Sequence, residues 1–194
     1  MSGPEASGSA IRAVHVGLVV LGFFLFWQLG VMLAHPPDYL LPAPSAVLAE
    51  LGSAPLWYLG HAFATLAATL LGFAAALAVG CLTAVGIVYS RVLENTLFTL
   101  LVALNSVPKI ALAPLFIIWM GTGLASKVAI SFLIALFVIV VDGVLGLRSI
   151  DPDAIDLFRA LRGGRLQILL WLRAPNALPH LFAGMKVAMS LAIV

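Results

Sequence analysis

The segment ASKVAISFLIALFVIVVDGVLGL, residues 125–147, decides the fold. It carries two charged side chains, Lys127 near its start and Asp142 in its last third, and the rest is apolar or small. About 20 residues of this kind are needed to cross the hydrocarbon core of a bilayer. The segment therefore predicts a membrane-spanning helix.

The rest of the chain has the same character. Hydrophobic residues make up 63% of the 194 residues and charged residues 9%, whereas soluble domains carry about 25% charged residues. No charged side chain occurs between Arg12 and Asp38 or between Glu50 and Arg91. We expect an all-α integral membrane protein with about five transmembrane helices. Their predicted ranges are 12–34, 61–89, 94–120 and 125–147, with an incomplete last helix over 181–194.

The segment 94–120 is ambiguous because Pro108 and Lys109 divide it. Two crossings would have about a dozen residues each, which is too few. They would also place the five arginines from Arg148 to Arg173 on the opposite side from Arg12 and Arg91, although basic residues favour the cytoplasmic side. We therefore predict one crossing, broken near Pro108.

These spans define the domain organisation. Residues 1–10 are expected to form a disordered cytoplasmic tail, and residues 11–194 a transmembrane domain with a cytoplasmic N-terminus. Ser45 is predicted to cap a short surface helix that runs to Leu51. Residues 148–181 are predicted to form a cytoplasmic loop. The final apolar run is too short to cross, so we expect the chain to be truncated at its C-terminus.

The loop 148–181 is the most informative region. Asp151-Pro152 is typical of a helix start, and Leu157 and Leu161 recur at helical spacing. Gly163-Gly164 should end this helix, and Arg165 begins a second one. Two short helices would present a compact knob, and an amphipathic helix that enters a groove is a common mode of protein recognition.

This loop resembles the EAA motif of ABC importer permeases. The motif's acidic residue corresponds to Asp156, its glycine to Arg162 with Gly163 one position late, and its Ile-x-Leu-Pro to residues 172–175, LRAP. Further similarity lies in LPAP (41–44), VPKIALAPL (107–115), WMGTG (119–123) and GLRSIDP (146–152). These motifs are similar to the nitrate, sulfonate, taurine and thiamine-precursor branch of that family.

The resemblance implies a MetI-like fold in a bacterial inner membrane. It implies ABC ATPase subunits, a second permease copy and an external solute-binding protein as partners. The solute would be a small anion, such as nitrate, a sulfonate or taurine, or a pyrimidine precursor of thiamine. The residues expected to couple to the ATPase are Asp156, Arg159, Ala160, Leu161, Arg162, Gly163, Gly164, Arg165 and Pro175.

Three residues are candidates for lining the solute path. Asp142 is an intramembrane acid, and such residues are functional by default; the alternative is an acid near the interface that pairs with Arg148. Pro108 and Lys109 could mark an unwound stretch beside the path, or Lys109 could extend to the interface.

The sequence lacks the signatures of an enzyme. None of its three lysines follows a glycine, as the lysine of a phosphate-binding loop must. We therefore expect no enzyme activity, no metal site and no cofactor, with ATP bound by a separate subunit. A secondary transporter or channel fragment is the alternative function, and such a protein would need more membrane-buried charges for ion coupling.

Overall fold

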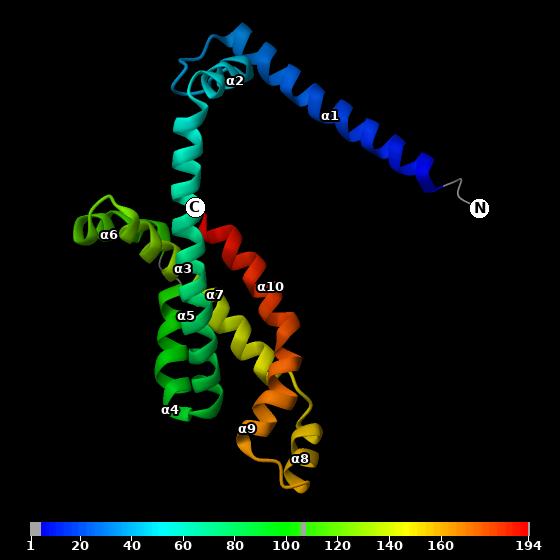
Figure 1. Cartoon of the computed structure of the whole chain (residues 1–194), viewed down its shortest axis with the longest axis vertical. Helices are drawn as coiled ribbons and strands as arrows, with labels where there is room; N and C mark the ends of the chain where they lie inside the picture. The colour runs from blue at the N-terminus through cyan, green and yellow to red at the C-terminus, as the bar shows by residue number, and fades with distance from the viewer. Residues whose placement is uncertain (1–4, 106–107, 194) are drawn as a thin grey trace. The chain divides into compact units, whose positions relative to one another are not determined.

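The computed structural model describes residues 5–105 and 108–193, and its regular structure there is helical. The chain divides into two compact units, Met1–Gly60 and His61–Val194. Figure 1 shows the helices of both units. Three helices are long and apolar enough to cross a membrane, at Val14–Ala34, Pro55–Tyr89 and Leu124–Arg148. The prediction of an all-α membrane protein is confirmed.

The first unit contains α1 (Glu5–Ala34) and α2 (Pro44–Ser53). α1 ends at the predicted His35-Pro36-Pro37, where His35 has a positive φ of 44°. It begins inside the segment predicted to be a disordered tail, because no proline after Pro4 interrupts the backbone hydrogen bonds.

The predicted cap of α2 is wrong. The N-cap residue is Ala43, because Pro44 takes the first helical position, where its missing N–H costs nothing. Ser45 instead donates its backbone N–H to the Gln28 side-chain oxygen at 3.1 Å, and this bond links α2 to α1.

α3 (Pro55–Tyr89) begins in the first unit and continues through the second, where it packs closely against α7 (Leu124–Arg148) through small residues. A Cβ added at Gly72 would lie 2.7 Å from the Ser131 Cβ, and one added at Gly80 would lie 2.8 Å from an Ile139 methyl carbon. The residue numbers of the contacting residues increase in the same direction along both helices, so α3 and α7 run parallel. In lipid, such close approach of small residues is a main source of helix association.

The segment between these helices must therefore return to the starting side. It contains α4 (Arg91–Leu93), the π-helical η1 (Glu94–Phe98), α5 (Thr99–Asn105), the 3₁₀-helical η2 (Lys109–Leu112) and α6 (Ala113–Met120). Figure 1 shows α5 alongside α3, with α6 turned away from it. Two full crossings would have made α3 and α7 antiparallel. One net crossing with a break around Pro108 agrees with the prediction.

The chain continues into α8 (Pro152–Ala160), α9 (Arg165–Gln167), the π-helical η3 (Ile168–Arg173) and α10 (Ala174–Ala192). α10 packs antiparallel to α7. At one end of the pair, a Cβ on Gly146 would lie 3.0 Å from the Ala177 Cα. At the other end, the buried Ser131 hydroxyl donates to the Ala192 carbonyl at 2.8 Å. Residues 174–181, predicted as part of a loop, are thus the first turns of a packed helix.

Pro175 and Pro179 do not break this helix, contrary to the expectation that they lie in a loop. Pro175 sits in the first turn of α10, and the wider π-helical turn of η3 directly precedes it. A proline inside a helix clashes with the carbonyl four residues earlier, and π-helical turns commonly absorb such interruptions. The helical path therefore runs on from Arg165 to Ala192.

Candidate functional site

The candidate site begins with α8, whose start follows the prediction. Asp151 is the N-cap, and its carboxylate accepts the backbone N–H of Asp153 at 3.0 Å. Pro152 follows in the first turn. Ile155 is the buried residue of this helix and fixes one of its faces against the rest of the unit.

The end of α8 is held by two backbone hydrogen bonds. The Gly163 N–H donates to the Phe158 carbonyl at 2.8 Å, and the Arg162 N–H donates to the Arg159 carbonyl at 2.9 Å. This pair of bonds defines a Schellman motif, which requires a left-handed residue just after the helix. That residue is Arg162, with φ of 62°. It occupies the position at which the EAA-like register placed a glycine.

Gly163 is required for a different reason. A Cβ at this position would lie 2.7 Å from the Phe158 carbonyl oxygen, which accepts the Gly163 N–H. At Gly164 the nearest atom to an added Cβ is the Gln167 side-chain oxygen, at 3.7 Å. That oxygen accepts the Gly164 N–H at 2.8 Å and starts α9. The two glycines, which the sequence treated as one helix stop, thus have separate roles.

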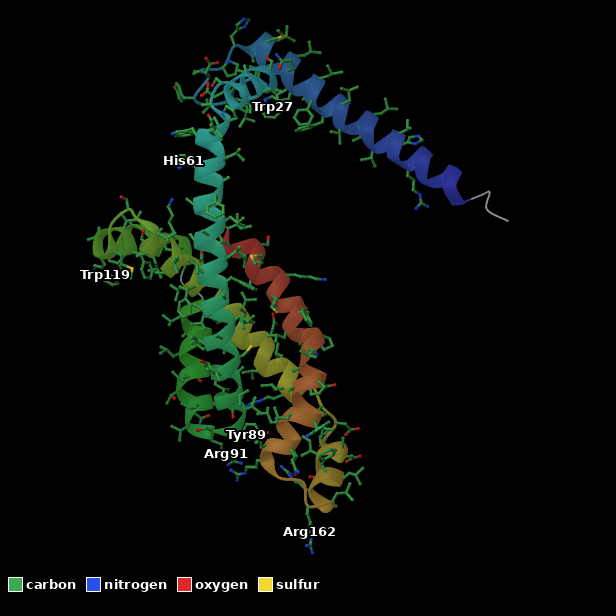
Figure 2. The ribbon with its side chains drawn as sticks, in the orientation of Figure 1. Trp27, His61, Tyr89, Arg91, Trp119 and Arg162 are labelled. Carbon is green, nitrogen blue, oxygen red and sulfur yellow. The ribbon has the colours of Figure 1, made fainter. Side chains whose placement is uncertain are left out.

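Residues 156–165, here called the loop tip, bring together all the predicted coupling residues except Pro175. Leu157 and Leu161 are 62% and 73% exposed there. Asp156 forms an exposed ion pair with Arg159 at 2.9 Å. Figure 2 shows Arg162 at the far end of the loop, with its side chain directed away from the helices. Pro175 lies apart from the tip, in the first turn of α10.

Behind the loop tip lies a cavity of about 550 Å³, here called the basic pocket. Its lining residues come from the end of α3, from α4 and from the loop: Val88, Tyr89, Arg91, Ile155, Arg159, Gly163, Arg165, Ile168 and Arg173. The sequence analysis did not group Tyr89 and Arg91 with the loop. They are distant in sequence, and only the parallel packing of α3 and α7 brings them together.

Tyr89 and Arg173 organise this pocket. The Tyr89 hydroxyl donates to the Arg165 carbonyl at 3.2 Å, and the Arg173 guanidinium lies 5.7 Å from the Tyr89 ring centre. Arg173 also donates to the Leu147 carbonyl near the end of α7, at 3.2 Å. A single arginine therefore connects the loop to the ends of two long helices.

The candidate path residues lie elsewhere. Asp142 faces α10 at Gly184, where an added Cβ would lie 2.8 Å from the Asp142 Cβ. The suggested pairing of Asp142 with Arg148 is wrong, because Arg148 pairs with Glu94 at 2.9 Å. Pro108 is exposed and precedes η2, which begins at Lys109. The Lys109 side chain lies outside the described residues.

Comparison with known proteins gives the family. Residues 76–194 match the model of the binding-protein-dependent transport system inner membrane component. The riboflavin transport system permease protein of Chloroflexus aurantiacus is 36% identical over 93% of this chain and 68% of its own length. The formylaminopyrimidine transport permease protein of Halalkalibacterium halodurans is 30% identical over 94% of this chain and 73% of its own length. The taurine transport system permease protein of Escherichia coli is 25% identical over 90% and 66%.

These relatives are transport permeases rather than enzymes, as the sequence predicted. Their similarity extends over most of the chain, and the family match includes α7, the loop and α10. The helices long and apolar enough to cross a membrane agree with a multi-pass inner-membrane protein. The chain therefore belongs to the family of inner-membrane components of binding-protein-dependent transport systems, the ABC permeases with a MetI-like domain.

Proposed function

We propose that this chain couples ATP hydrolysis to solute import through the loop tip. In this proposal the chain and a second permease copy form the translocation path, and separate subunits bind ATP. An external binding protein delivers the solute. The observation that carries the proposal is the exposure of Leu157 and Leu161 on a helix with a tightly defined end. Exposed leucines on a rigid knob suit a groove on a partner.

The orientation follows from charge. Arg91, Arg148 and the loop arginines lie at one end of the second unit, where α4, α8 and α9 also lie (Figure 1). Basic residues favour the cytoplasmic side, so we assign this end to the cytoplasm. Because Arg12 precedes the first apolar span, we propose a cytoplasmic N-terminus as well. A cytoplasmic ATPase could then reach the loop tip.

The test is association with the ABC ATPase subunit of the same transporter. Leu161→Asp places a charge on the exposed apolar surface and should abolish both co-purification and ATP-dependent uptake. Asp153→Asn is the matched control, because Asp153 is exposed on the same helix and its side chain makes no hydrogen bond within the described residues. Intact association and uptake in Leu161→Asp would refute the coupling role.

For the solute, we propose a heterocycle of the flavin or pyrimidine kind rather than a small inorganic anion. The support is that relatives named for riboflavin and formylaminopyrimidine are 36% and 30% identical. Those named for taurine, bicarbonate and nitrate are 24–25% identical. Uptake of labelled riboflavin, a formylaminopyrimidine, taurine and nitrate into proteoliposomes with the complete transporter would decide. Uptake of nitrate or taurine alone would contradict the proposal.

A further inference from the structure

The basic pocket contains more positive charge than the structure neutralises. Four arginines line it, Arg91, Arg159, Arg165 and Arg173. Arg159 pairs with Asp156. Within the described residues, no carboxylate pairs with any of the other three. Guanidinium groups gathered around one cavity repel one another unless an anion is present.

Arg173 is held in place at this pocket. Its Nε is buried and has no hydrogen-bond partner among the described residues, although its Nη1 donates to the Leu147 carbonyl. This Nε is closed to solvent and therefore also to a ligand in the pocket, so a ligand would meet the remaining atoms of the guanidinium group.

The location of the pocket identifies the kind of anion. Tyr89 is the last residue of α3, and Arg173 bonds to the carbonyl of Leu147, the last but one residue of α7. The pocket therefore lies at the depth where these two long apolar helices end. Tyrosine and arginine near span ends are typical of the membrane interface, which is the depth of lipid phosphates.

The surface beside the pocket suits acyl chains. Leu166, Leu170 and Trp171 are 66%, 56% and 74% exposed on α9 and η3, within three residues of Arg165 or Ile168 along the chain, and Leu170 also lines an apolar cavity with Leu147 and Leu169. Free phosphate would gain nothing from such a surface. Basic pockets between membrane helices on the cytoplasmic side are a known mode of binding acidic headgroups.

We propose that the basic pocket binds the phosphate of an anionic phospholipid of the cytoplasmic leaflet. The headgroup phosphate would accept hydrogen bonds from Arg91, Arg165 and Arg173, and the acyl chains would lie along Leu166, Leu170 and Trp171. Bound lipid would thereby connect the end of α3 to the loop. The proposal requires that this end meets the membrane surface, and it does not require that an ATPase contacts the loop tip.

The test uses the purified transporter complex and two short-chain lipids, dioctanoyl phosphatidylglycerol and dioctanoyl phosphatidylcholine. Native mass spectrometry gives the dissociation constant of each. Arg91→Gln and Arg165→Gln should each weaken phosphatidylglycerol binding about fivefold and leave phosphatidylcholine binding unchanged. Arg162→Gln is the matched control, because it removes the same charge from the same loop but lies outside the pocket. It should have no effect.

Other arms separate the competing explanations. Arg173→Gln should also weaken phosphatidylglycerol binding, and its melting temperature shows whether the fold survives. If Arg162→Gln weakens phosphatidylglycerol binding as much as Arg91→Gln does, the attraction comes from general surface charge, and the proposal is overturned. Displacement of phosphatidylglycerol by equimolar inorganic phosphate would also overturn it, in favour of a free anion. If Arg91→Gln and Arg165→Gln abolish ATPase association and leave phosphatidylglycerol binding unchanged, these arginines bind the partner protein, and the proposal is overturned as well.

Discussion

The adjacent glycines at the end of α8 allow a sharp test of the loop structure. We consider Gly163→Ala, which adds one methyl group at the point where the chain leaves the helix. The new Cβ would lie 2.7 Å from the Phe158 carbonyl oxygen and 3.0 Å from a carbon of the Phe158 ring. One of these contacts is with backbone, which cannot rotate away as the end of a flexible side chain can.

The size of the effect follows from these distances. Ordinary contact with a Cβ begins at 3.4 Å, so the carbonyl must move away by about 0.7 Å. The Gly163–Phe158 hydrogen bond, now 2.8 Å long, would then approach 3.5 Å, where little of a hydrogen bond remains. The loss of a backbone hydrogen bond costs about 1 kcal/mol net. At about 1.4 kcal/mol per factor of ten, the amide should open about fivefold more often.

Hydrogen exchange of the purified transporter, read by mass spectrometry on peptides that cover residues 157–167, measures this opening. Gly164→Ala is the matched control, because its Cβ would have no neighbour closer than 3.7 Å. Exchange should accelerate in Gly163→Ala and stay unchanged in Gly164→Ala. Equal exchange in both variants and the parent would refute the geometry assigned to the end of α8.

Three further predictions concern the same unit. Arg162→Gly should slow hydrogen exchange of the loop tip, because a residue with a Cβ costs about 1–2 kcal/mol in the left-handed conformation and glycine removes that cost. Arg162→Ala keeps this cost and loses only the charge, so it should not slow exchange. Gly72→Ala should lower the melting temperature of the complex, because the new Cβ would lie 2.7 Å from the Val128 carbonyl oxygen. Gly60→Ala is the control: its Cβ would have no neighbour within 4 Å, so this variant should raise the melting temperature slightly. Glu94→Gln and Arg148→Gln should each lower the melting temperature only slightly, because the side chains of this ion pair are 35–40% exposed and such pairs contribute about 0–1 kcal/mol. A large drop in melting temperature in either variant would show that the pair has a structural role.

The arrangement of the spans was predictable because lipid imposes strong constraints on a sequence. A stretch such as residues 125–147 leaves few alternatives to a membrane helix. The single crossing of residues 94–120 was predictable from where arginines fall. The structure supports it by a separate route, the parallel contacts of Gly72 with Ser131 and of Gly80 with Ile139.

The end of α8 was only partly predictable. Gly163-Gly164 is a plain helix-stop signal, but the residue that takes the left-handed conformation is Arg162. Propensity alone would not select an arginine, since glycine is far more common there. The EAA-like register did point to this position, because it placed the motif's glycine at Arg162. The hydrogen bonds of Arg162 and Gly163 then fix the turn.

The boundary between loop and α10 was mispredicted because Pro175 and Pro179 are strong signals against helix. A helix is usually predicted to end before a proline. The sequence pattern gave no sign of the π-helical turn that precedes Pro175. The basic pocket was missed for another reason. Its members belong to two separated segments, 88–91 and 155–173, and no local pattern links Tyr89 to Arg173.

The route from the loop tip to the membrane helices gives the proposed coupling its mechanical basis. The helical path from Arg165 to Ala192 begins at the last residue of the loop tip, so displacement of the tip should also move α10. Gly146 and Gly184 hold α10 against α7 at contacts with no spare room for a Cβ, and Arg173 ties the base of this path to Leu147. α10 and α7 should therefore move as one body when the tip is pulled. A disulfide engineered between these two helices would then leave ATP-driven uptake intact, and loss of uptake when such a variant is oxidised would show that α7 and α10 must separate during transport.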